Sequence, residues 1–184
     1  RVLELGCATG GNLIAMAEQL PFSQFVGIDL SPRQIAEGQA LIHELGIENI
    51  VLRPMSILDV TPELGQFDYI ICHGVYSWVP RDVQSKILSV CKQNLAPNGV
   101  AFISYNVYPG WHSRGMVRDM MQFHARHGGD PETCTKRARE LLAWLIASHP
   151  DHQSSYSKLL REEQQRIEDC RDTFRITAGS TTVD

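Results

Sequence analysis

Short apolar runs alternate with helical stretches over the first 106 residues of this 184-residue chain. Each run is short enough for a strand, and the runs lie at residues 2–5, 24–29, 49–55, 67–74 and 100–106. Between them, residues 13–20, 32–45 and 81–95 repeat apolar positions at helical spacing. This alternation predicts an α/β fold with right-handed crossovers and a parallel, Rossmann-like sheet of strand order 3-2-1-4-5.

The pattern becomes purely helical after the fifth run. Helices are expected at residues 111–127, 132–148 and 154–174. In the first of these, Met116, Met120 and Phe123 share one side, with Val117 beside them, which predicts a packing stripe. The last ten residues are polar and without a period, so they are expected to fray. The expected organisation is a core at residues 1–109, a helical segment at 110–174 and a tail at 175–184.

The first strand and helix are joined by a glycine-rich segment, ELGCATGGN at residues 4–12. Glycine lacks a Cβ, so a ligand can approach this backbone closely, and the helix start offers unpaired N–H groups. A dinucleotide fingerprint needs glycine at positions 6, 8 and 11, but Ala8 occupies the middle position. The S-adenosylmethionine pattern is met by Glu4, Gly6 and Gly10. A carboxylate here also repels a pyrophosphate and attracts an ammonium, which favours S-adenosylmethionine as the cofactor.

Further cofactor contacts are expected at the ends of the next strands. Asp29 ends the second strand, where an acid accepts hydrogen bonds from ribose hydroxyls, and the helix-cap role is better filled by Ser31. Adenine is expected near Ser56, with Asp59 as the open alternative. The full expected cofactor-binding set is Glu4, Gly6, Cys7, Ala8, Gly10, Asn12, Asp29, Leu30, Ser56, Ile57 and His73.

Aromatic residues follow the fourth and fifth strands at the same expected edge of the sheet. His73, Tyr76 and Tyr105 are the candidate catalytic residues, since His73 or Tyr105 has a group able to assist a proton transfer. Substrate contacts are expected from Tyr76, Trp78, Tyr108 and Trp111. Aromatic faces of this kind tolerate a cation and can desolvate an amine.

Composition narrows the class of protein. The net charge is −4 and no basic face stands out, which argues against a primary nucleic-acid binder. Five cysteines without a CxxC pair suit a reducing cytoplasm, and no apolar run is long enough for membrane insertion. Two histidine pairs, His124 with His127 and His149 with His152, lack further ligands at suitable spacing, so no metal is expected. The oligomeric state is open.

Several motifs together resemble a known group of enzymes. They read ELGCATGGN, GIDLS, FDYIICHGVYSWVP, ISYNVYPGW and GMVRDMMQFHAR. The chain resembles bacterial class I S-adenosylmethionine-dependent methyltransferases that carry a methyltransferase regulatory domain, and it is similar to the rickettsial protein-lysine methyltransferases. The likeness implies methyl transfer to a lysine amine of a protein substrate.

The same resemblance exposes a departure. Class I methyltransferases add a sixth and an antiparallel seventh strand, and this sequence has no apolar alternating pair that would form them. The sheet edge beside the fifth strand is therefore expected to be unfinished. The expectation is that the chain is a fragment with weak activity. Three alternatives stay open: a small-molecule methyltransferase, a nicotinamide-dependent dehydrogenase, and a non-catalytic cofactor-binding module.

Overall fold

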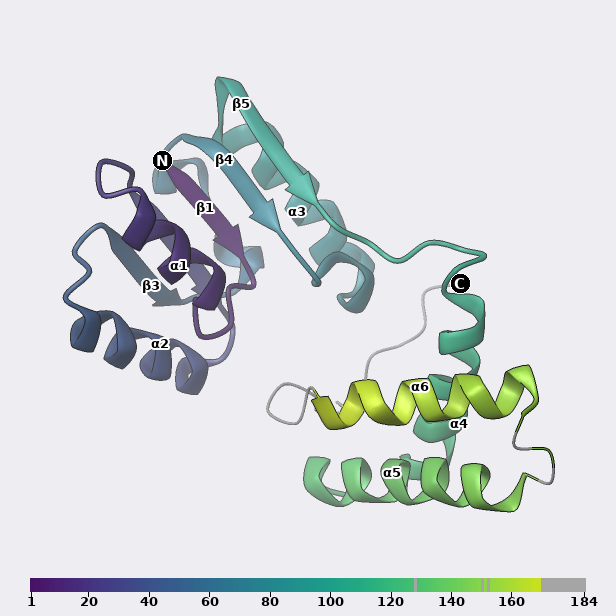
Figure 1. The fold of residues 1–184 in the computed structure, drawn as a ribbon. Helices are drawn as coiled ribbons and strands as arrows, with labels where there is room; N and C mark the ends of the chain where they lie inside the picture. The colour runs from purple at the N-terminus through teal and green to yellow at the C-terminus, as the bar shows by residue number, and fades with distance from the viewer. Residues whose placement is uncertain (128, 150, 152, 170–184) are drawn as a thin grey trace. The chain divides into compact units, whose positions relative to one another are not determined.

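The computed structural model describes residues 1–127, 129–149, 151 and 153–169. The chain forms two compact units, and the division falls between Tyr105 and Asn106, four residues before the boundary expected from the sequence. The first unit contains the sheet, and the second contains helices (Figure 1). Within the described residues every helix is too short or too polar to span a lipid bilayer.

The first unit is built on a five-stranded parallel sheet. Its strands are β1 (Val2–Leu5), β2 (Phe25–Asp29), β3 (Ile50–Pro54), β4 (Phe67–Cys72) and β5 (Leu95–Ile103). The strand order is β3-β2-β1-β4-β5, which confirms the order expected from the alternation of apolar runs and helices. Because all neighbouring strands run parallel, the loops after β1 and β4 leave the sheet at the same edge.

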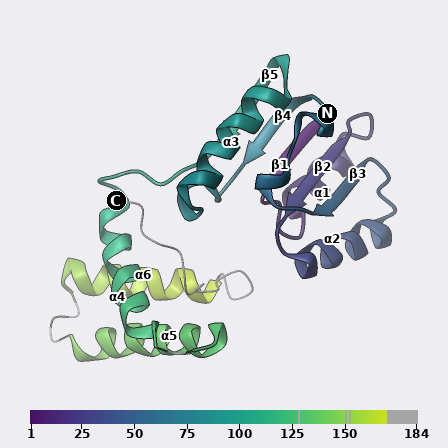
Figure 2. The ribbon, with the colours of Figure 1, turned by 180° about the vertical axis from the view of Figure 1, so that it is seen from behind.

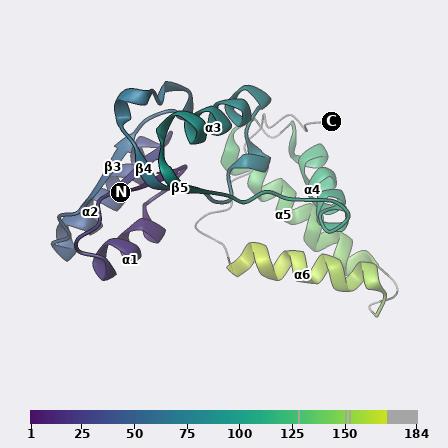
Figure 3. The same ribbon diagram turned by 90° about the horizontal axis from the view of Figure 1, so that it is seen from above.

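Helices cover both faces of this sheet, as the two opposite views in Figures 1 and 2 show. Helices α1 (Gly11–Gln19) and α2 (Pro32–Leu45) pack on one face, where Leu13, Ile14 and Ile35 join a buried cluster with strand residues. Helix α3 (Arg81–Asn94) packs on the other face through Ile87 and Val90, and the view from above in Figure 3 separates it from α1. Short 3-10 turns occur at Ile57–Asp59 (η1), Pro62–Leu64 (η2) and Tyr76–Trp78 (η3).

The transition from α3 to β5 corrects the expected boundaries. The helix ends at Asn94 and the strand begins at Leu95, whereas the sequence pattern predicted a helix to residue 95 and a strand from residue 100. Leu95 pairs with Phe67, and the register then shifts before Tyr69 pairs with Val100. Pro97 lies in the shifted segment and has no N–H to donate to a ladder. The irregular pairing therefore extends the strand across a segment that reads as a turn.

The second unit contains α4 (His112–Ala125), α5 (Pro131–Ser148) and α6 (Ser155–Asp169). Its core includes Val117, Met121 and Ala125 from α4, with Met120 packed against it, so the prediction holds for Val117 and Met120 and is wrong for Met116 and Phe123, which are exposed. Phe123 is 65% exposed, and its ring lies 3.9 Å from the guanidinium carbon of Arg126. A one-residue change of phase rotates a helix face by about 100°, and the partner helices decide which phase is buried. Residues 170–184, the expected end of the last helix and the tail, lie outside the described residues.

Candidate functional site

The glycine loop after β1 has an unusual backbone conformation. Gly6, Ala8 and Gly10 all have positive φ, at 76°, 50° and 78°. Gly10 is the N-cap of α1, and its carbonyl accepts the N–H of Ile14 at 2.8 Å. The loop therefore reverses the chain tightly and leaves the first N–H groups of α1 without intrahelical partners.

Asp29 ties this loop to the end of β2. Its Oδ2 accepts the Ala8 N–H and its Oδ1 accepts the Ser31 N–H, both at 2.9 Å. Ser31 is the N-cap of α2, as expected, with its hydroxyl accepting the Gln34 N–H at 3.4 Å. Each carboxylate oxygen has a second lone pair, so Asp29 retains acceptor capacity for further donors such as ribose hydroxyls.

The side chain of Cys7 is buried beneath the glycine loop. Its side chain joins the buried cluster under α1, and an ideal Cβ on Gly27 would lie 2.8 Å from its Sγ. Burial, reinforced by the charges of Asp29 and Glu4, raises the pKa of the Cys7 thiol to about 12. Its N–H donates to the Ile28 carbonyl at 3.0 Å. Cys7 thus shapes the loop from beneath.

Glu4 is a buried acid at the edge where the loop leaves β1. It is 4% exposed, and its Oε1 accepts a hydrogen bond of 3.0 Å from Nδ2 of Asn12. Among the described residues, its Oε2 has no hydrogen-bond partner. Burial raises the pKa of Glu4, while the Asn12 hydrogen bond and the nearby His73 lower it. An unpaired carboxylate oxygen in such surroundings costs free energy unless a donor reaches it.

The loop after β4 lies directly against the glycine loop. An ideal Cβ on Gly6 would lie only 2.5 Å from Cγ2 of Val75. The Gly74 N–H donates to Oγ of Ser104 at 2.8 Å, and this bond joins the loop to the end of β5. Val75 and Ser104 were not among the expected site residues, because an apolar loop residue and a strand-end serine carry no distinctive sequence signal. The two loops form one continuous surface at the carboxyl edge of the sheet.

Three of the expected aromatic residues lie on this surface. His73 stacks on Phe102 with ring centroids 6.0 Å apart, and the rings of Tyr76 and Tyr105 are 6.2 Å apart at 58°. The side-chain amide of Gln84 donates to the carbonyls of Tyr76 and Val79, which holds the η3 turn to α3. Trp78, in the same turn, is 38% exposed. The arrangement brings an imidazole and two phenol rings to the edge that also carries Glu4.

The expected adenine side is formed by η1 after β3. Oγ of Ser56 accepts the Leu58 N–H at 3.2 Å and so caps this turn, while Ile57 packs against the core and Asp59 is exposed. The Met55 N–H donates to the Asp29 carbonyl at 2.9 Å, which joins the segment before η1 to the end of β2. Leu30, between Asp29 and Ser31, is 77% exposed. Both Ser56 and Asp59 remain candidates for the adenine contact.

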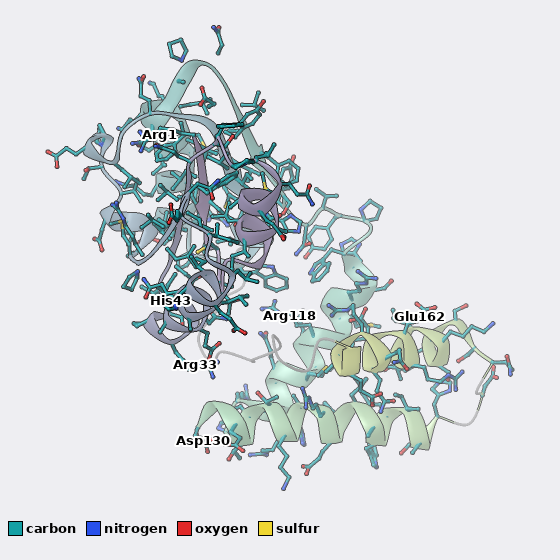
Figure 4. All side chains as sticks on the ribbon, turned by 60° about the vertical axis from the view of Figure 1, so that its left-hand side comes forward. Arg1, Arg33, His43, Arg118, Asp130 and Glu162 are labelled. Atoms are coloured by element: carbon teal, nitrogen blue, oxygen red, sulfur yellow. The ribbon has the colours of Figure 1, made fainter. Side chains whose placement is uncertain are left out.

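The remaining expected residues belong to the second unit. The Tyr108 ring lies 4.1 Å from the His112 ring, and Trp111 is the N-cap of α4. Nδ1 of His149 lies 3.0 Å from Oγ of Ser157, and His152 lies outside the described residues. In the part of the chain that the structure describes, there is no group of three metal-ligating side chains. Figure 4 draws the described side chains, with Arg33 and His43 marking α2 and Arg118, Asp130 and Glu162 marking the helical unit.

A protein-family comparison identifies the first unit. The family model described as "Methyltransferase domain" matches residues 3–101. The chain belongs to this methyltransferase domain family. This match confirms the expected class I fold. It also confirms S-adenosylmethionine as the cofactor of the family.

Individual relatives extend the likeness into the helical unit. An uncharacterized protein of Rickettsia prowazekii is 42% identical over 174 residues, which cover 95% of this chain and 70% of that protein. A second uncharacterized protein of the same organism is 44% identical, over 89% of this chain and 30% of its own length. The structure of PKMT2 from Rickettsia typhi in complex with AdoHcy matches with a TM-score of 0.72 and 44% identity, over 91% of this chain and 32% of PKMT2. The chain thus spans about a third of that longer enzyme.

Proposed function

We propose that this chain binds S-adenosylmethionine at the edge carrying Glu4, the glycine loop and Asp29. The observation that carries the proposal is Oε2 of the buried Glu4, which has no hydrogen-bond partner among the described residues and would accept a hydrogen bond from the ammonium of the cofactor's methionine part. Asp29 would accept the ribose hydroxyls with its free lone pairs. The backbone of Gly6, Ala8 and Gly10 would pass close to the cofactor.

The adenine half would lie toward η1. Ile57 and Leu30 offer apolar surface there, and Ser56 or Asp59 offers a polar contact to the adenine amino group. Cys7 contributes by its packing beneath the loop, and Asn12 by its contact with Glu4. Two acids support this placement, because Glu4 would face the ammonium of the cofactor and Asp29 would face its ribose.

We infer further that the methyl acceptor is a lysine amine of a protein. The bound cofactor supplies an electrophilic methyl group on a sulfonium. The rings of Tyr76 and Tyr105 lie in contact, with centroids 6.2 Å apart, so together they present one aromatic surface to an amine, and aromatic faces accept a cation during desolvation. PKMT in the name of the Rickettsia typhi relative denotes a protein lysine methyltransferase, and its 44% identity to this chain supports the same acceptor class.

The side chains would act mainly by alignment and by removing a proton from the amine. His73, stacked on Phe102, has a ring nitrogen able to accept that proton. Trp78, Tyr108 and Trp111 are proposed to contact the protein substrate. The proposed site of action is the cytoplasm, because the cysteines are free thiols in the described residues.

Cofactor binding is tested by calorimetry of this chain with S-adenosylmethionine, AdoHcy and NAD. The first two should bind and NAD should not. Binding of NAD alone would overturn the proposal in favour of a dehydrogenase.

Acceptor class is tested with radiolabelled methyl donor and bacterial envelope and cytosolic extracts. Label should enter protein and be recovered as methyl-lysine. Tyr76→Ala and Tyr105→Ala should lower the rate on protein by about three- to thirtyfold while leaving AdoHcy binding unchanged. Tyr69→Ala, which removes an exposed tyrosine of β4 outside the proposed site, is the control and should retain activity. Label only in small molecules, or binding without any turnover, would contradict the lysine assignment.

A further inference from the structure

Asn12 makes a contact that its position does not require. It is the second residue of α1, whose N-cap Gly10 offers no side chain to the helix start. Instead of bonding to the helix, the Asn12 amide reaches back across the glycine loop and donates to Oε1 of Glu4 at 3.0 Å. Asn12 is exposed and Glu4 is buried, so this hydrogen bond joins a surface residue to a buried carboxylate.

The two oxygens of Glu4 are therefore unequal. Oε1 is held by Asn12, and Oε2 has no partner among the described residues. The terminal torsion of a glutamate is broad, so without a donor on one oxygen the carboxylate would be free to rotate. One fixed oxygen leaves the other in a defined direction.

Apart from Asn12, one neighbouring group among the described residues favours the ionised form of Glu4, namely His73. The titratable groups that interact with it are His73 at the end of β4 and the thiols of Cys7 and Cys72. Burial raises the pKa of Cys7 to about 12 and that of Cys72 to about 11, so both thiols are neutral near neutral pH. Asn12 and His73 thus oppose the effect of burial on the carboxylate.

We propose that Asn12 is a positioning residue that keeps Glu4 ionised and presents its Oε2 to the ammonium of the bound cofactor. This inference rests on the proposed cofactor site. In this proposal Glu4 contacts the amino-acid part of the cofactor, and Asn12 raises the affinity for that part by acting on Glu4.

The test measures AdoHcy affinity by calorimetry between about pH 5 and pH 8.5, a range in which a raised carboxylate pKa is visible. Affinity of the unaltered chain should fall toward acid pH as Glu4 becomes protonated. Asn12→Leu should weaken binding about tenfold near neutral pH and move this fall to higher pH, because a charge-assisted hydrogen bond is lost. Asn12→Gln, which keeps an amide donor, should recover part of the affinity.

Two controls isolate the pair. His73→Gln removes the other titratable side chain beside Glu4, and the pH dependence of AdoHcy affinity that this variant retains should disappear when Glu4→Gln is added. Adding Asn12→Leu to Glu4→Gln should change AdoHcy affinity by less than about twofold. The nucleoside 5′-methylthioadenosine lacks the amino-acid part, so its affinity should be the same in all four Glu4 and Asn12 combinations. That probe also reports whether each variant is folded.

The outcomes separate this inference from the proposed function. If neither AdoHcy nor 5′-methylthioadenosine binds to the unaltered chain, the cofactor site itself is wrong. If both bind but Asn12→Leu leaves the AdoHcy profile unchanged, or weakens both ligands equally, Asn12 does not position Glu4.

Discussion

The backbone N–H of Ala8 donates a hydrogen bond of 2.9 Å to Oδ2 of Asp29, and this contact joins the glycine loop to the end of β2. Ala8 has a φ of 50°, which is uncommon for a residue with a Cβ, so the loop needs such a restraint. The acid proposed to bind ribose therefore also holds the loop that would surround the cofactor.

Replacement of Asp29 should consequently affect binding and stability together. Asp29→Ala should weaken AdoHcy binding by about 1.5–3 kcal/mol and should lower the melting temperature, because two backbone donors lose their acceptor. Asp29→Asn keeps one acceptor oxygen, so its AdoHcy affinity and melting temperature should lie between those of the unaltered chain and those of Asp29→Ala. Calorimetry and thermal unfolding measure these effects. Glu44→Ala, an exposed acid on α2, is the control, and an Asp29→Ala variant that binds as well as this control would refute the assignment.

Gly6→Ala should disturb both loops of the site. Gly6 has a φ of 76°, and a Cβ there would lie 2.5 Å from Cγ2 of Val75. Left-handed backbone and overpacking together should reduce the free energy of unfolding by about 2–4 kcal/mol. Gly46→Ala is a matched control, because Gly46 has a φ of 65° but no atom within 4 Å of its ideal Cβ.

Denaturant unfolding measures these changes. Gly46→Ala should lower the free energy of unfolding by about 1–2 kcal/mol, which is the cost of the left-handed backbone conformation alone. Adding Val75→Ala to Gly6→Ala should recover part of the stability by removing the steric clash. Equal losses for Gly6→Ala and Gly46→Ala would show that Val75 yields without cost.

The buried thiols should make stability depend on alkaline pH. Burial raises the pKa of Cys7 to about 12 and that of Cys72 to about 11, from 9.0 in both cases. A group with a raised folded-state pKa binds protons more tightly when folded, so its contribution is present below pH 9 and is lost as pH rises toward those values. Unfolding free energies of the chain and of a Cys7→Ala, Cys72→Ala variant should therefore converge as pH rises.

Alkylation followed by peptide mass spectrometry gives an independent measurement. At about pH 8 both thiols should react slowly in the native chain and readily after unfolding in guanidinium chloride, because the thiolate is the reactive form. Rapid native alkylation of Cys7 would contradict its location beneath the glycine loop.

Asn49 should stabilise the edge of the sheet opposite the proposed site. Its side-chain amide donates to the carbonyls of Ala17, Leu20 and Ser23 at 3.0–3.1 Å, which fastens the segment between α1 and β2 to the start of β3. Asn49→Ala should lower the free energy of unfolding by about 1–3 kcal/mol, because these carbonyls lose a shared donor. Urea unfolding measures the loss, with the exposed Asn98→Ala as control. AdoHcy affinity should not change, and a large loss of affinity would show that the two edges are coupled.

Local patterns were sufficient to predict the sheet and most of its helices. Short apolar runs predicted the strands. Ser31 and Pro32 predicted the start of α2 and Gly46 predicted its end, because caps and turns depend on a few neighbouring residues. The same locality explains the errors. The irregular pairing of Leu95 with Phe67 depends on a strand 28 residues away, and the buried side of α4 depends on α5 and α6.

The sequence by itself determined the fold class, the strand order, the glycine loop and the acids at the ends of β1 and β2, since strand alternation and glycine content report directly on backbone geometry. Only the tertiary structure decided that Asn12 bonds to Glu4, that one oxygen of Glu4 is left without a partner in the described residues, and that Val75 lies against Gly6. These contacts join segments that meet only when parallel strands align their ends, and their energies depend on burial, which no local pattern of residues specifies.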